Sequence, residues 1–221
     1  TYTLAVAESD GANPRPISYH ETHEWDPAVL SDGRVIYTRW DYVDRHAVHY
    51  QQLWTVRPDG SDVRIFYGNN TFNPMATFEP RAVPGSDLIM AIAGCHHSIA
   101  AGSVVLVNVR QGMDGLRPLT RLTPDVLFPE TETDMHGGWN IPLGQVPVQA
   151  RRWPGHTYKS PLPLSEDFFL AGYSFDQLTH DETRPNPANM FGLYTVDRFG
   201  NKELIYRDPQ IACVTPIPLR P

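Results

Sequence analysis

Residues 27–67 read PAVLSDGRVIYTRWDYVDRHAVHYQQLWTVRPDGSDVRIFY, a pattern typical of four short β-strands joined in sequence. β-rich runs alternate with turns: the runs are 27–30, 35–40, 53–56 and 63–67, and the tight turns are 31–33 and 58–60. Both turns contain Asp-Gly, and Asp-Gly between β-rich runs is a strong hairpin signal. We therefore expect a four-stranded antiparallel meander here.

The same order of runs and turns recurs twice further along the chain. The three predicted repeats span about residues 25–70, 78–123 and 159–208. At the ends, residues 4–7 and 15–18 match the last two strands of a repeat, and residues 213–218 match a first strand. The chain is thus expected to begin and end within a repeat.

Four-stranded units that recur every few tens of residues predict a β-propeller, in which typically 4–8 such units, the blades, are arranged radially. The predicted fold is therefore all-β, with three full blades and partial blades at both ends. Three blades and fragments do not complete a ring, so we expect the chain to be part of a larger propeller. It begins at Thr1 without Met or a signal-peptide pattern, which indicates a processed protein or an excised segment.

Composition excludes several other classes of protein. The 221 residues include 21 Pro and 16 Gly, which favours many turns and excludes a helical bundle. Eighteen Lys and Arg against 25 Asp and Glu give a net charge of −7, so a nucleic-acid partner is not expected. No apolar run reaches the roughly 18 residues of a membrane span, so no transmembrane segment is predicted.

The repeats resemble the TolB-like or PD40 class of propeller blades, whose pattern is carried here by residues 27–35 and 53–60. Residues 23–27 and 32–45, followed by Leu53-Trp54, resemble more specifically the propeller region of proteins related to the hydrazine synthase alpha subunit. That resemblance implies a periplasmic or secreted, multidomain protein in which the propeller accompanies c-type haem domains. The implied partners are other domains or subunits of a larger complex.

The haem chemistry of that family is not supported by this sequence. Attachment of a c-type haem needs Cys-x-x-Cys-His, and Cys95-His96 lacks the other cysteine. The second cysteine of the chain, Cys213, is distant in sequence, and two cysteines make neither a disulfide scaffold nor a zinc finger. We therefore expect no haem cofactor in this chain.

Histidines gather on one predicted face of the propeller. In an antiparallel blade, the loop between strands two and three and the loop to the next blade lie on the same face. All nine histidines fall in such loops: His20, His23, His46, His49, His96, His97, His136, His156 and His180. Imidazole is a usual ligand of first-row divalent metals. One divalent metal is thus a candidate cofactor, with candidate ligands His20, His23, His46, His49, His96 and His97.

A structural interpretation stands beside the metal hypothesis. Histidines in exposed loops more often hydrogen bond the backbone or cap a turn than bind metal. Five further residues at strand ends are expected to hold neighbouring blades together by packing and buried hydrogen bonds: Trp25, Asp26, Arg39, Trp40 and Asp41. The sequence leaves both interpretations of the face open.

A predicted insertion over residues 124–158 separates the second and third repeats. It is longer than the roughly 12–15 residues beyond which a loop without structure becomes unusual. An acidic stretch, 130–134, precedes the cluster Arg151-Arg152-Trp153, and Arg and Trp are favoured in interfaces. The insertion is expected to contact a partner domain or to be a surface excursion.

Three functions follow from these patterns. We favour a non-catalytic propeller scaffold of a larger extracytoplasmic protein, because the fold alone supports nothing more specific. The alternative is a metal-dependent lyase or hydrolase with its site on the histidine-rich face. A third is an accessory propeller of a haem redox complex, although no Gly-x-Ser-x-Gly, phosphate-binding or dinucleotide motif marks an active site here.

Overall fold

A computed structural model describes residues 2–44, 50–96, 98–129, 156–176 and 186–219. The described chain is β-sheet and connections, with one short 3₁₀ turn at Val109–Gln111. None of the described helical residues forms a helix long and apolar enough to cross a membrane. The all-β prediction is confirmed.

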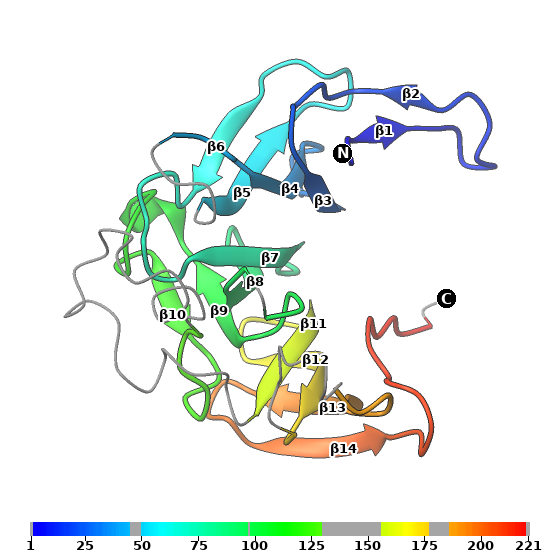
Figure 1. Ribbon diagram of the computed structural model, residues 1–221, viewed down its shortest axis with the longest axis vertical. Helices are drawn as coiled ribbons and strands as arrows, with labels where there is room; N and C mark the ends of the chain where they lie inside the picture. The colour runs from blue at the N-terminus through cyan, green and yellow to red at the C-terminus, as the bar shows by residue number, and fades with distance from the viewer. Residues whose placement is uncertain (1, 45–49, 97, 130–155, 177–185, 220–221) are drawn as a thin grey trace.

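Three four-stranded meanders and an N-terminal hairpin make up the structure (Figure 1). The hairpin pairs β1 (Ala5–Val6) with β2 (Arg15–Pro16). The strands of the first meander are β3 (Glu24–Val29), β4 (Val35–Trp40), β5 (Gln51–Val56) and β6 (Arg64–Tyr67). Those of the second are β7 (Ala76–Ala82), β8 (Ile89–Gly94), β9 (Ser103–Val107) and β10 (Leu119–Arg121). The third contains β11 (Thr157–Pro163), β12 (Phe168–Ser174), β13 (Gly192–Asp197) and β14 (Lys202–Tyr206).

Within each meander, consecutive strands pair antiparallel, and the meanders follow one another along an arc (Figure 1). A single parallel bridge, Gln51 to Ala76, links the first meander to the second. Tyr158 and Gly102 form an isolated antiparallel bridge between the third meander and the second. The first strand of each meander, β3, β7 or β11, contacts a neighbouring meander.

Alternation of side chains along the strands builds the core. On β8, Ile89 and Ala91 are buried against the first meander, whereas Met90 and Ile92 are buried against the third. Successive side chains of a strand point to opposite faces, so an uninterrupted apolar run serves two interfaces at once. The sheets therefore stack face to face, and β8 contributes to the cores on both sides of the second meander.

One bulge recurs on the first strand of every meander. In each, a polar residue with positive φ precedes a proline: Asp26 (56°), Glu79 (53°) and Ser160 (51°). The strand register shifts at the same place in all three. The left-handed backbone conformation is unusual for residues other than Gly, so its recurrence marks a common geometry.

These pre-proline residues are joined from meander to meander by hydrogen bonds. Glu79 N–H donates to Asp26 Oδ2 at 3.2 Å, and Ser160 N–H donates to Glu79 Oε2. Ser160 Oγ also donates to Glu79 Oε1 at 3.0 Å, and Lys159 Nζ lies 3.5 Å from the same oxygen. We call this chain of contacts the pre-proline ladder. It fixes the first strands relative to one another.

Two details differ from the sequence predictions. β11 begins at Thr157, inside the predicted insertion, because Tyr158 is fully buried in the core between the second and third meanders. Residues 213–218, predicted as a strand, form none. A first strand pairs with the second strand of its own meander, and no such strand follows residue 218 in the described chain; Pro216 and Pro218 also lack N–H donors.

Candidate functional site

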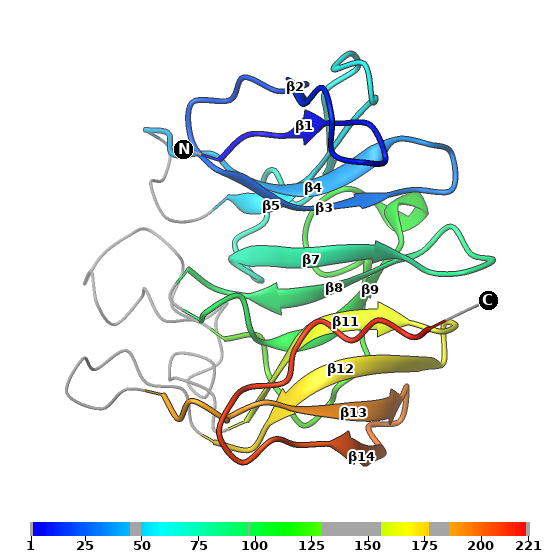
Figure 2. The same cartoon turned by 90° about the vertical axis from the view of Figure 1, so that its right-hand side faces the viewer.

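The described histidines of the predicted metal site lie at the end of the meanders that carries the longer connections. The β4–β5 and β8–β9 connections are at this end, which we call the loop face, and the tight turns after β3 and β7 are at the opposite end (Figure 2). His20, His23 and His96 gather there around Trp40. Antiparallel pairing of β3 with β4 brings the segment before β3 to the end of β4, which explains the meeting of His20 and His23 with Trp40.

His20 is held by the end of β4. Its Nε2 lies 3.1 Å from Trp40 O and 3.3 Å from Asp41 Oδ1. Asp41 also accepts a hydrogen bond from Arg39 Nε at 2.7 Å, and the guanidinium of Arg39 stacks 3.4 Å above the Trp54 ring. The carboxylate of Asp41 thus lies between a guanidinium and an imidazole and orients both.

His23 is packed among aromatic rings. Its centroid lies 5.3 Å from that of Tyr2, 5.5 Å from that of Trp25 and 5.7 Å from that of Trp40. Its Nδ1 accepts a hydrogen bond from Tyr2 N at 3.3 Å. Rings at such separations contribute about 0.5–1.5 kcal/mol per pair beyond the area they bury. His23 therefore helps to hold the N-terminal segment against the first meander.

His96 reaches the same cluster from the second meander. Its ring centroid is 5.0 Å from that of Trp40, and its Nδ1 is 2.7 Å from the amide Nε2 of Gln51, a residue that is almost fully buried. An amide N–H that donates to Nδ1 places the imidazole proton on Nε2. Gln51 and Trp40 together orient His96 across the boundary between two meanders.

The remaining histidines of the sequence prediction lie elsewhere or outside the described residues. His46, His49 and His97 are outside them, as are His136 and His180. His156 lies beside the third meander, with Nδ1 3.1 Å from the Tyr173 hydroxyl. Within the described part of the chain, no three His, Cys, Asp or Glu side chains are placed to hold a metal ion together. A metal site that includes His46, His49 or His97 stays a prediction.

Trp25 and Asp26 connect meanders, as the sequence predicted. The Trp25 ring contacts that of Phe78 with centroids 6.5 Å apart, and Asp26 accepts the Glu79 N–H. Burial, and then the nearby Glu79 carboxylate, raise the pKa of Asp26. The Arg39–Asp41 pair, in contrast, lies within the first meander.

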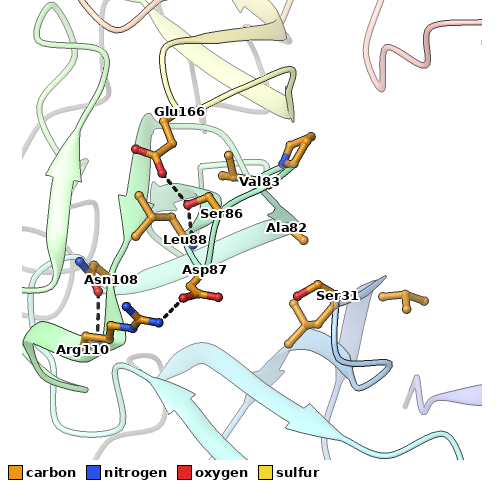
Figure 3. A pocket seen from close by; sticks show the side chains of 13 residues that line it. Ser31, Ala82, Val83, Ser86, Asp87, Leu88, Asn108, Arg110 and Glu166 are labelled. Atoms are coloured by element: carbon orange, nitrogen blue, oxygen red, sulfur yellow. Dashed lines mark hydrogen bonds and ion pairs between the residues drawn. The ribbon is translucent and has the colours of Figure 1, made fainter.

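A wide hollow that the sequence did not indicate lies at the opposite end, among the tight turns (Figure 3). It has a volume of about 790 Å³ and is lined by turns of all three meanders, including residues 82–88. Several of its polar groups are partnered within the protein: Ser86 Oγ donates to Glu166 Oε1 at 2.6 Å, and Arg110 forms an ion pair with Asp87. Both members of that ion pair are exposed, so it contributes little to stability.

The cluster around Trp40 presents aromatic side chains at the surface of the loop face. Tyr2 and Tyr42 are exposed aromatic residues at its edge, and Trp25 and Trp40 are partly exposed. Aromatic side chains with polar ends are enriched in protein interfaces because they bury a large area at low cost in side-chain entropy. The arrangement is therefore suited to contact with another protein surface.

Comparison with known proteins gives a fold but no family. No protein-family model matches the sequence, and no curated protein matches it. Among solved structures, a chain of Kuenenia stuttgartiensis hydrazine synthase matches with a TM-score of 0.59 and 16% sequence identity over 92% of this chain. The chain corresponds to 22% of the length of that match. Its fold is therefore similar to that of part of a hydrazine synthase chain.

Proposed function

We propose that this chain is a non-catalytic part of a β-propeller that acts as a scaffold in a larger extracytoplasmic protein, with its loop face contacting another domain or subunit. One observation carries the proposal. The imidazoles of His20, His23 and His96 are engaged in hydrogen bonds and ring contacts around Trp40, which organise a partly exposed aromatic surface. Such a surface fits an interface.

The matched hydrazine synthase chain supports the larger context. The present chain is equivalent to about a fifth of that chain, so the same fold occurs there within a much longer polypeptide. The periplasmic or secreted location and the TolB-like blade class rest on the sequence resemblance. A fold shared at 16% identity carries no activity with it.

Footprinting tests the scaffold. Hydroxyl-radical labelling of the protein expressed from its complete gene should leave Tyr42, which is 57% exposed here, protected by the partner surface. Phe199, 77% exposed and located at the tight turn between β13 and β14, is the internal control and should react freely. Equal reactivity of both side chains would remove the loop face as an interface.

A metal-dependent enzyme is the second candidate, favoured by the 3.3 Å contact between His20 and Asp41. Elemental analysis before and after dialysis against a chelator decides between the two functions. The metal-dependent enzyme predicts about one equivalent of a transition metal that is lost on dialysis. His20→Ala should lack this metal and His156→Ala should retain it, and that result would contradict the scaffold. Protein without bound metal, equally stable after dialysis, would support the scaffold.

A further inference from the structure

The outward face of the third meander carries apolar side chains that the other meanders bury. Strand register matches three sets of positions: Ile36, Met90 and Leu170; Leu53, Val104 and Leu193; Tyr67, Leu122 and Tyr206. The first two members of each set are at most 1% exposed, because the next meander covers them. In the third meander, Leu170 and Leu193 are partly exposed and Tyr206 is 53% exposed.

A fourth set, at the turn after each first strand, shows the same contrast. Leu30 and Val83 are 8% and 2% exposed, whereas Leu164 is 37% exposed. In each meander, the backbone N–H of this residue donates a hydrogen bond across the tight turn between the first and second strands. The third meander thus repeats the surface that is buried in the two interfaces already described.

Residues 213–218 occupy the place of a further first strand beside this face. Thr215 precedes Pro216 and has a φ of 55°, as the pre-proline residues of β3, β7 and β11 do. Its Oγ1 is 3.4 Å from Ser160 Oγ, so it extends the pre-proline ladder by one step. Cys213 N–H donates to the carbonyl of Phe191, the residue immediately before β13. The equivalent contact between the second and third meanders joins Gly102, immediately before β9, to Tyr158 of β11.

A groove of about 390 Å³ shows the same equivalence. The two residues that follow the bulge proline line it in each of the first strands and in the C-terminal segment: Ala28 and Val29, Arg81 and Ala82, Leu162 and Pro163, Ile217 and Pro218. Four equivalent pairs around one groove indicate that the C-terminal segment occupies a position equivalent to that of β3, β7 and β11. The path of the C-terminal segment along β11 agrees with this placement (Figure 2).

We propose that the outward face of the third meander is a docking surface for a fourth antiparallel meander, with residues 213–218 as its first strand and its other strands supplied by the polypeptide that follows them. This inference rests on the proposed function, which makes the chain part of a larger protein. The pre-proline ladder and the groove both place residues 213–218 in the position of a first strand beside β11. The chain that continues from this segment is therefore the occupant that would repeat the existing interface between meanders. A second copy of the chain would have to displace residues 213–218, which already occupy the position of the first strand.

Footprinting and hydrogen exchange on the protein expressed from its complete gene test this docking surface. Tyr206 should be protected from hydroxyl radicals, while Phe199, 77% exposed at the turn between β13 and β14, reacts freely. The amides of Val214 and Ile217 should exchange at least about tenfold more slowly than unprotected amides, because a paired strand opens rarely. Free reactivity of Tyr206, or exchange of these amides at the unprotected rate, would overturn the proposal.

A matched pair of variants separates the docked face from the opposite one. Leu193→Asp places a charge on the outward face, whereas Leu204→Asp places one on the other face, where Leu204 is opposite Tyr194 and 51% exposed. Leu193→Asp should accelerate exchange at residues 213–218 and Leu204→Asp should not; equal effects would overturn the docking. Protection of Tyr42 is a separate readout, so loss of the scaffold role and loss of the fourth meander are distinguishable.

Discussion

Asp26 combines three properties that follow from its position at a bulge. It has a positive φ, its carboxylate accepts the Glu79 N–H, and it is largely buried. Burial disfavours the charged form, and the Glu79 carboxylate adds repulsion, so the pKa rises above 3.8 although the Glu79 N–H hydrogen bond and then the charges of Lys159 and Arg81 oppose the shift. The carboxylate is therefore useful as a hydrogen-bond acceptor but costly as a charge at neutral pH.

Asp26→Asn should raise the melting temperature at pH 7. Asparagine keeps an amide oxygen for the Glu79 N–H and tolerates positive φ, while the buried charge is removed. Because the folded-state pKa of Asp26 is raised, its favourable contribution is full below the unfolded pKa and is lost as the pH rises through the folded pKa. The advantage of the variant should shrink as the pH falls through that window, as followed by thermal melts against pH.

Asp32→Asn is the control of opposite sign. A hydrogen bond from the Arg34 side chain lowers the pKa of this exposed carboxyl, so its small contribution is present above the unfolded pKa and is lost as the pH falls. The variant should therefore be slightly less stable at pH 7. Parallel pH profiles for the two variants would contradict the role assigned to burial at Asp26.

At the scale of single elements, the hairpin turns show how the same backbone conformation has different consequences. Gly33 and Gly60 have φ of 84° and 87°, and each closes an Asp-Gly turn. A Cβ on Gly33 would meet open space, whereas one on Gly60 would lie 2.8 Å from Ile17 O, where the N-terminal hairpin rests on the first meander. The second turn is constrained by a tertiary contact as well as by φ.

Gly33→Ala should cost about 1–2 kcal/mol of unfolding free energy, the penalty for an L-residue in left-handed conformation. Gly60→Ala should cost more, because the new methyl group also pushes the segment at Ile17 away. Denaturant unfolding of both variants measures the difference. An equal loss would mean that Ile17 does not rest on this turn.

The pre-proline ladder makes a second prediction at the element scale. Glu79→Ala removes both carboxylate oxygens, which leaves the buried Ser160 N–H without its acceptor. The expected loss is about 1–3 kcal/mol, the cost of an unsatisfied buried polar group. Glu166→Ala is the matched control: Glu166 also accepts from a serine hydroxyl, but at the surface, and its loss should change stability by about 0.5 kcal/mol or less.

For the whole molecule, stacking of sheets is the main source of burial. Leu53 is buried between the first and second meanders, and Leu193 is at the equivalent position of the third, where the described chain leaves it partly exposed. Equivalent side chains thus differ in burial only through what lies beside them. The loss of unfolding free energy on truncation of such a leucine to alanine therefore shows whether a neighbouring meander covers it.

Leu53→Ala should destabilise the isolated 221-residue chain by about 2–5 kcal/mol, and Leu193→Ala by clearly less, since a partly exposed leucine has less burial to lose. In the protein expressed from its complete gene, the two losses should become similar, because the fourth meander covers Leu193. Thermal and denaturant unfolding of both variants in both proteins provides the comparison. A persistent difference in the longer protein would leave the third meander as the uncovered end.

The strand order of each meander was predictable because its signals are local. Asp-Gly turns between apolar runs fix hairpins over a few residues, so the strands at 35–40, 53–56 and 192–196 could be read directly. The start of β11 at Thr157 could not, because Thr157 and Tyr158 are strand residues by virtue of burial against Gly102 and the second meander. The cluster around Trp40 was likewise hidden: it depends on the register of β3 with β4 and on the approach of His96 from another sheet.

What the sequence by itself determined is the repeating meander and the presence of many histidines in the longer connections, since both depend on residue types at short spacing. Only the tertiary structure decided what those side chains contact. Stacking of the sheets turned alternating side chains into two cores, made Asp26, Glu79, Ser160 and Thr215 a continuous ladder, and oriented His20, His23 and His96 around one tryptophan. The physical reason is distance: these contacts join residues far apart in the chain, and their geometry is set by inter-sheet packing rather than by local conformational preference.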